Sequence, residues 1–148
     1  MQRIEHCVVA LLLTLSAPFA GAQVLSVSGN PSSLTVSTAT AGLGLDPVVD
    51  ASTTYSVTTT LPNQKIVARL TTALPSGVIL KVRLQPPSGV TALGDISLTT
   101  TNADVVGPIP VIGPHLTLSI TYTLSALVTA GTVSTTGRDV VFSVVAGP

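Results

Sequence analysis

The sequence predicts an all-β protein, an antiparallel β-sandwich of about eight or nine strands. Residues 116–128, LTLSITYTLSALV, alternate apolar and hydroxyl side chains, and this period of two places successive side chains on opposite faces of a strand. Similar patterns recur about every ten residues between turns rich in Gly and Pro, as they do in sandwiches. No helical period follows residue 22. A β-barrel is the alternative, because strand number alone does not separate the two architectures.

The first 22 residues predict a cleaved secretory signal peptide. A short polar start with Arg3 precedes the apolar run VVALLLTL, and the small residues Ala20-Gly21-Ala22 form a cleavage site before Gln23. A membrane anchor is the alternative, but the run is much shorter than the ~20 residues that a spanning helix needs. We therefore expect residues 23–148 to form a single exported domain without a transmembrane segment, located in the periplasm, at the cell surface or outside the cell.

Two strands and an apolar loop are expected at the start of this domain. Residues 24–28 form a short strand that ends at Gly29-Asn30-Pro31, and residues 33–38 form a second. The following loop, 38–50, contains Leu43, Leu45, Val48 and Val49 and is too apolar for a plain solvent loop. We expect it to lie against the end of the sandwich or to hold a partial edge strand.

The middle of the chain predicts three more strands. Residues 52–61 and 65–71 flank the turn at Pro62-Asn63 and are interpreted as a hairpin. A Pro-Ser-Gly turn at 75–77 leads into a cleanly alternating strand at 78–84. Four basic residues would then gather on the outer side of adjacent strands, either as a binding patch or, as we favour, as charges that protect an edge strand from aggregation. They are Lys65, Arg69, Lys81 and Arg83.

The last third predicts a short strand, an irregular segment and two further strands. After a turn at 86–89, residues 95–100 form a strand. Residues 102–114 are expected to be irregular, since Pro108 and Pro110 exclude a central strand. In the long strand 116–128 the even-numbered side chains, from Leu116 to Val128, should face the core. Residues 139–145 form the last strand.

The charge and cysteine content exclude several kinds of site. Cys7 is the only cysteine and would leave with the signal peptide, so no disulfide or thiolate ligand would remain. From residue 23 onward five basic and five acidic side chains balance one another. This balance leaves no basic surface for nucleic acid or for anionic lipids.

We find no pattern that predicts catalysis, a metal or a cofactor. His115 lacks the nucleophile and carboxylate, or the further ligands, that a base or a metal site needs, so we interpret it as a loop histidine at the entrance of the long strand. Asp46 and Asp50 would lie on one side of a strand, but two carboxylates are too few for a calcium site. The chain has neither a G-x-S-x-G elbow nor a complete nucleotide-binding glycine loop.

The sequence offers two candidate binding surfaces, an aromatic platform and a row of hydroxyls. Tyr55, Tyr122 and Phe142 fall on the apolar sides of their strands, which favours core packing over an aromatic platform for sugars. The odd-numbered side chains of the long strand form a row of hydroxyls that could order water or ice, pair with a neighbouring sheet, or simply be solvated. The row consists of Thr117, Ser119, Thr121, Thr123 and Ser125.

Three features carry a resemblance to known proteins: AGAQ at the end of the predicted signal peptide, LTLSITYTLSAL as the next-to-last strand, and RDVVFSVV near the end of the chain. In these features the chain resembles bacterial secreted immunoglobulin-like β-sandwich domains and, more distantly, pilin and spore-coat-U subunits. The resemblance implies strand addition between subunits through an N-terminal extension. The corresponding positions here are Leu25, Val27, Leu34 and Val36. The chain lacks the cysteine pair and the terminal aromatic strand of many such subunits.

The function that we expect is therefore non-catalytic. The chain would be a structural or interaction protein of the bacterial envelope or extracellular matrix, with itself or another envelope protein as partner. The alternative is a secreted module that binds a ligand, most naturally a carbohydrate.

Overall fold

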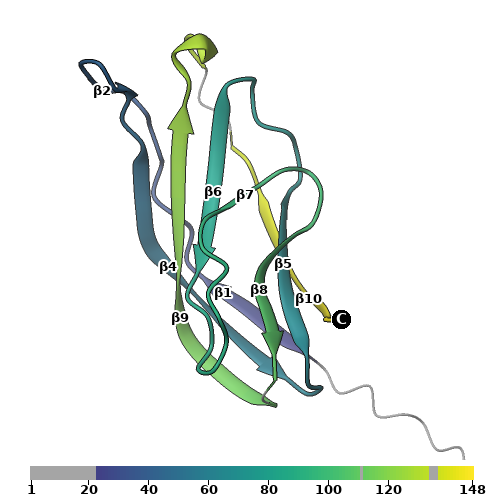
Figure 1. The fold of residues 1–148 in the computed structure, drawn as a ribbon. Helices are drawn as coiled ribbons and strands as arrows, with labels where there is room; N and C mark the ends of the chain where they lie inside the picture. Colours follow the sequence, from purple (N-terminus) through teal and green to yellow (C-terminus); the bar gives the residue numbers. More distant parts are fainter. Residues whose placement is uncertain (1–22, 111, 134–136) are drawn as a thin grey trace, which may run out of the picture.

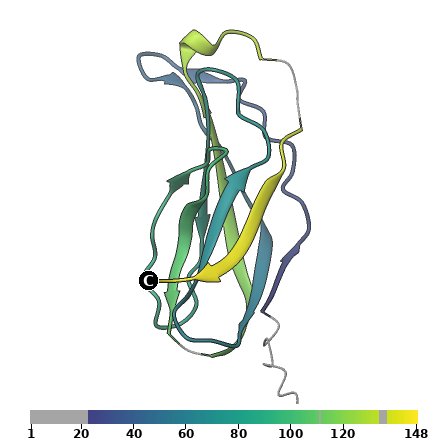
Figure 2. The same cartoon turned by 90° about the vertical axis from the view of Figure 1, so that its right-hand side faces the viewer.

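The computed structural model describes residues 23–110, 112–133 and 137–148. The predicted signal peptide, with Cys7, lies outside the described residues. Within them the chain forms antiparallel sheets that pack face to face (Figures 1 and 2). The prediction of an all-β sandwich is thus confirmed. The described residues contain no helix with the length and apolarity of a membrane span.

The larger sheet has five strands in the order β1-β4-β9-β6-β7. Its strands are β1 (Val24–Ser28), β4 (Val48–Thr59), β9 (Gly113–Ala126), β6 (Val78–Leu84) and β7 (Ile96–Ser97). The second sheet has the order β10-β5-β8, with β10 (Val140–Ala146), β5 (Gln64–Leu70) and β8 (Ala103–Ile109). A small ladder joins β2 (Ala39–Thr40) to β3 (Gly44–Leu45), and one 3₁₀ turn, η1 (Val128–Ala130), follows β9.

The core lies between the two sheets. Ile120 of β9, Ile66 of β5 and Ile109 of β8 are fully buried, and Tyr55 and Val82 pack with them. Alternation along β4 and β6 sends the intervening side chains outward, as the sequence predicts, whereas β5 and β8 bury consecutive residues such as Val67 and Val105-Val106. Because the described residues contain no disulfide, packing of these branched aliphatic side chains is the main source of stability.

Two irregularities in the β4–β9 ladder shift the phase of the alternation. Tyr55 pairs with Leu118, but Val57 pairs with His115, so β9 has one extra residue between these pairs. Thr117 has a φ of 57° at this bulge. The bulge turns Leu116 outward, where it is 65% exposed, and the expectation that Leu116 faces the core is wrong. Val128 is exposed because the strand ends before it.

The predicted hairpin of 52–61 with 65–71 is also wrong. β4 and β5 follow one another along the chain but belong to different sheets, so the turn between them crosses from one layer to the other. Lys65 and Arg69 therefore lie on one sheet and Lys81 and Arg83 on the other, and the four do not form a common patch. Lys65 instead pairs with Asp104 at 3.1 Å, and Arg83 Nε lies 3.6 Å from Asp95.

Three further segments differ from the sequence expectation. Residues 33–38 form no strand, and 95–100 contribute only the two residues of β7. The segment 102–114, expected to be irregular, contains β8 and the start of β9. Pro108 fits β8 because this strand lies at the edge of its sheet, where a missing N–H costs no ladder bond. The loop 38–50 does hold the partial strands β2 and β3.

Candidate interaction surfaces

Asp46, Asp50 and His115, the titratable residues considered in the sequence as site candidates, have separate surroundings in the structure. Asp46 accepts a hydrogen bond from Thr40 Oγ1 at 2.8 Å, whereas Asp50 is bound to two serines. His115 is half-buried in β9, opposite Val57, rather than on a loop. Among the described residues no three His, Cys, Asp or Glu side chains lie close enough together to hold a metal ion.

Asp50 anchors the segment before the β2–β3 ladder. Its Oδ2 accepts hydrogen bonds from Ser32 Oγ at 2.5 Å and Ser32 N at 3.3 Å, and its Oδ1 accepts from Ser52 Oγ at 2.7 Å and Ser52 N at 3.0 Å. The hydroxyl of Ser32, followed by the donors of Ser52, lowers the pKa of Asp50 to about 2. With each oxygen bound by two donors, the carboxylate fastens residues 29–38 to β4.

Of the four positions that correspond to a donor strand, Leu25, Leu34 and Val36 are half-buried and Val27 is 41% exposed. Leu25 and Val27 of β1 stand opposite Val57 and Tyr55 of β4 and face inward. Leu34 and Val36 are half-buried, and Leu34 packs against the core. Strand addition by β1 would therefore require it to leave β4.

A groove of about 700 Å³ opens between residues 29–36 and β10. Its walls combine apolar and polar side chains. The apolar ones include Leu34, Leu124, Val140, Phe142 and Tyr122, and the polar ones include Asn30, Thr35 and Arg138. β10 pairs with β5 on one side only, and no described strand pairs with its other edge. The groove therefore lies along an open edge of the smaller sheet.

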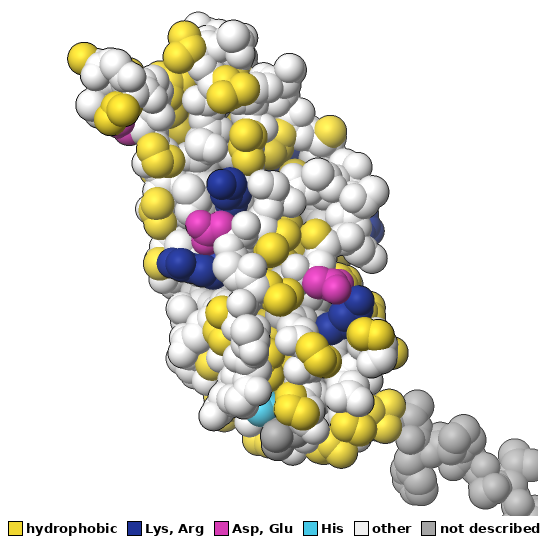
Figure 3. Space-filling model, in the orientation of Figure 1, with side chains coloured by type: hydrophobic (Ala, Val, Ile, Leu, Met, Phe, Trp, Pro, Cys, Tyr) yellow, Lys and Arg dark blue, Asp and Glu magenta, His cyan; other side chains and the backbone are white. Residues whose placement is uncertain are grey.

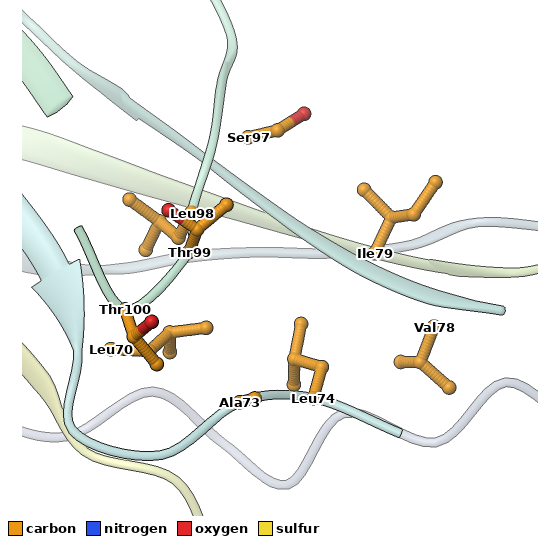
Figure 4. Close-up of a pocket in the computed structure, with 9 residues that line it drawn as sticks. All are labelled: Leu70, Ala73, Leu74, Val78, Ile79, Ser97, Leu98, Thr99 and Thr100. Carbon is orange, nitrogen blue, oxygen red and sulfur yellow. The ribbon is translucent and has the colours of Figure 1, made fainter. Parts of the chain in front are cut away.

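A second hollow of about 380 Å³ lies where the two sheets diverge (Figure 4). Leu70, Ala73, Leu74, Val78 and Ile79 line it from the end of β5 to the start of β6, and residues 97–100 line the opposite wall. Hydroxyls supply its only side-chain polar groups, those of Ser97, Thr99 and Thr100. Its lining contains no acidic or basic side chain.

The predicted hydroxyl row forms part of a wider hydroxyl face. Thr117, Ser119, Thr121 and Thr123 lie on the outer side of β9, and the register continues this face across β4 and β1. The added members are Thr54, Ser56, Thr58, Ser26 and Ser28. Several of these groups bind one another or the chain: Ser28 Oγ lies 2.6 Å from Thr54 Oγ1, and Ser119 Oγ donates to Gln85 Oε1 at 3.2 Å. Lys81 and Arg83 interrupt the face on β6.

The aromatic side chains Tyr55 and Tyr122 belong to the core, and Phe142 packs against it. Tyr55 is buried, and its hydroxyl donates to Gln85 O at 2.6 Å. Burial raises the pKa of both Tyr55 and Tyr122, since it disfavours the phenolate. Phe142 packs against the core from β10. Tyr55 and Tyr122 are thus buried, whereas Phe142 is half-buried and lines the groove beside β10.

Large apolar side chains are exposed at both ends of the molecule, and in the sequence only the apolar loop 38–50 indicates this. At the end that carries the β2–β3 ladder and η1, we define the upper patch as Leu43, Val49, Leu127 and Val128. At the opposite end, where β4 turns into β5 and β9 begins, we define the lower patch as Val24, Leu61, Ile112 and Leu116. Most charged side chains visible in Figure 3 lie across the middle of the molecule, and apolar ones reach both ends.

No protein-family model matches this chain, and no curated protein matches its sequence.

Proposed function

We propose that this chain is an exported, non-catalytic structural subunit of the bacterial envelope or extracellular matrix that assembles with copies of itself. The observation that carries the proposal is the exposure of the eight apolar side chains of the upper and lower patches, each more than half exposed. Large apolar side chains that gather at the ends of a protein favour contact between subunits, because covering them removes apolar surface from water.

The composition of the remaining surface, which has few unpaired charges and many hydroxyls, supports this proposal. The ion pairs Lys65–Asp104 and Arg83–Asp95 engage four of the few charged residues within the molecule itself. The outer face of the larger sheet carries hydroxyls, and Asp50, which is buried near the start of β4, is bound by Ser32 and Ser52 within the molecule. These features are typical of structural subunits, since neutral sheets and apolar ends favour contact between subunits. They also agree with the resemblance to immunoglobulin-like surface domains.

The buried aromatic residues favour the structural proposal over a carbohydrate-binding module. Sugar recognition usually depends on exposed ring faces, whereas Tyr55 is 1% exposed and Tyr122 is 4% exposed.

Sedimentation velocity of the exported protein over a hundredfold range of concentration tests the proposal. A structural subunit should form larger species as concentration rises, because association follows mass action. A protein that remains a monomer throughout, and whose melting temperature rises with an oligosaccharide, would contradict it. The mass of the exported protein reports in the same experiment whether cleavage occurs before Gln23.

A further inference from the structure

The side chains of Gln23 and Gln64 link the two sheets at the end of the sandwich where β1 and β5 begin (Figure 1). Gln23 directly precedes β1 and is half-buried, and its Nε2 donates a hydrogen bond to Gln64 Oε1 at 2.6 Å. Gln64 is the first residue of β5 and is 4% exposed. Its backbone pairs with Ala146 of β10 on one side and with Ile109 of β8 on the other. The acceptor of this hydrogen bond is therefore held in place by both neighbouring strands.

Gln23 is also the residue at which the exported chain is expected to begin, because the predicted cleavage site directly precedes it. Cleavage there gives Gln23 a free α-amino group in addition to its side-chain amide. Such a glutamine can cyclise without a co-reactant, since the neutral α-amine can attack the amide carbon of its own side chain. The Nα–Cδ bond forms, the Cδ–Nε2 bond breaks, and Nε2 leaves as ammonia with the proton that Nα releases. The product is an uncharged N-terminal lactam.

The hydrogen bond to Gln64 opposes this reaction in two ways. The attack requires the side chain of Gln23 to fold back over its own backbone nitrogen, whereas the bond holds the amide on β5 of the other sheet. In addition, the donor Nε2 is the atom that leaves. Cyclisation must therefore break the bond first, and afterwards the buried Gln64 Oε1 has lost its donor, which costs free energy.

From this geometry, and resting on the proposed export of the chain, we propose that Gln23 is a site of N-terminal lactam formation and that Gln64 controls the reaction. The chain is open to cyclisation until it folds, and it is protected once the two sheets have closed on each other. The lactam and the hydrogen bond exclude one another, so a chain that cyclises first folds without this link between β1 and β5. The cyclised fraction of the protein thus records how long the cleaved chain stayed unfolded.

The rate at which the exported protein loses ammonia tests the proposal. Mass spectrometry follows the N-terminal proteolytic fragment over time at pH 8, where about half of an ordinary α-amine is neutral. The folded protein should cyclise at least about fivefold more slowly than the same protein in guanidinium chloride, since one hydrogen bond must be broken. This comparison needs no variant, so it holds even if a substitution is not tolerated.

A matched pair of substitutions assigns the protection to Gln64. Gln64→Leu removes the acceptor, so the folded variant should cyclise at about the rate of the unfolded chain. Gln85→Leu is the control, because Gln85 is exposed and its side chain accepts hydrogen bonds from Ser119 and not from Gln23. The control should cyclise as slowly as the unmodified protein. Melting temperatures above the temperature of the assay confirm that both variants are folded.

Equal rates for the folded and the unfolded protein would overturn the proposal. A Gln64→Leu variant that cyclises as slowly as the unmodified protein would overturn it as well, and so would an exported chain that does not begin at Gln23. None of these results bears on self-assembly, which the sedimentation experiment decides separately.

Discussion

Two turns of identical sequence provide a matched test of how the upper end of the molecule is held. Pro75-Ser76-Gly77-Val78 and Pro87-Ser88-Gly89-Val90 each close with a hydrogen bond from the valine N to the proline O, at 3.1 Å in both. Gly77 and Gly89 both have a φ of +80°. A glycine at the third position of such a turn relieves the strain that a side chain would suffer there.

The two glycines differ in what a side chain would meet. A Cβ at Gly89 has nothing within 4 Å, whereas a Cβ at Gly77 would lie 2.9 Å from Ala130 Cβ and 3.1 Å from Ala130 Cα. Gly89→Ala should therefore cost only the backbone strain, about 1 kcal/mol of unfolding free energy. Gly77→Ala should cost that amount plus about 1–3 kcal/mol, because carbon atoms prefer a separation of about 3.5–4.0 Å and η1 must shift.

Urea unfolding of both variants and of the unmodified protein measures this difference. The slopes of the three transitions should agree, so that the midpoints report stability. Gly77→Ala should be the less stable variant by about 1–3 kcal/mol. Equal destabilisation of the two variants would refute the reasoning, because it would mean that η1 does not pack on the turn as described.

Three other substitutions test the core, a buried hydroxyl and the anchor of residues 29–38. Ile120→Ala should lower the unfolding free energy by about 3–4 kcal/mol in urea, since Ile120 is fully buried between the sheets; a loss below about 1 kcal/mol would place it outside the core. Tyr55→Phe removes the bond to Gln85 O and should cost about 1 kcal/mol at pH 7. Because the pKa of Tyr55 is raised, the unmodified protein should lose stability as the pH rises above about 10, and Tyr55→Phe should lose less of its own. For Asp50, whose pKa is lowered to about 2, the stabilising effect is present above the ordinary pKa of 3.8 and disappears as the pH falls toward 2. Asp50→Asn should reduce this acid dependence in thermal melts between pH 4 and 2, and Asp46→Asn is the control; an unchanged acid dependence in Asp50→Asn would contradict the assigned role.

Alternation in the sequence was enough to predict the sandwich and several strands. β6 spans residues 78–84 as expected, and the exclusion of a central strand at Pro108 was correct because β8 lies at an edge, although the segment is not irregular. Partner choice was not predictable from the local pattern. β4 and β5 look like a hairpin, yet they join different sheets, since pairing depends on which faces can be buried together and not on the intervening turn.

The interaction surfaces were predicted less well, and the reason is physical. A single extra residue reverses the direction of every later side chain in a strand, and no signal in LTLSITYTLSALV marks the bulge at Thr117. Leu116 was therefore assigned to the core although it belongs to the lower patch. For the upper patch, the apolar loop 38–50 was the available signal. The strand-like alternation of residues 33–38 was misleading because Asp50 holds this segment through Ser32 and not through a ladder.

The pairing of β5 with β10 has a consequence for how the chain folds. β5 is the central strand of its sheet, and its partner is made from the last strand, so that Leu70 stands opposite Val140. The second layer cannot be completed until nearly the whole polypeptide has been synthesised, and such distant pairings form slowly. Until then one edge of β5 stays open to other chains. Newly made molecules should therefore be most prone to aggregate through this edge until β10 has paired with β5.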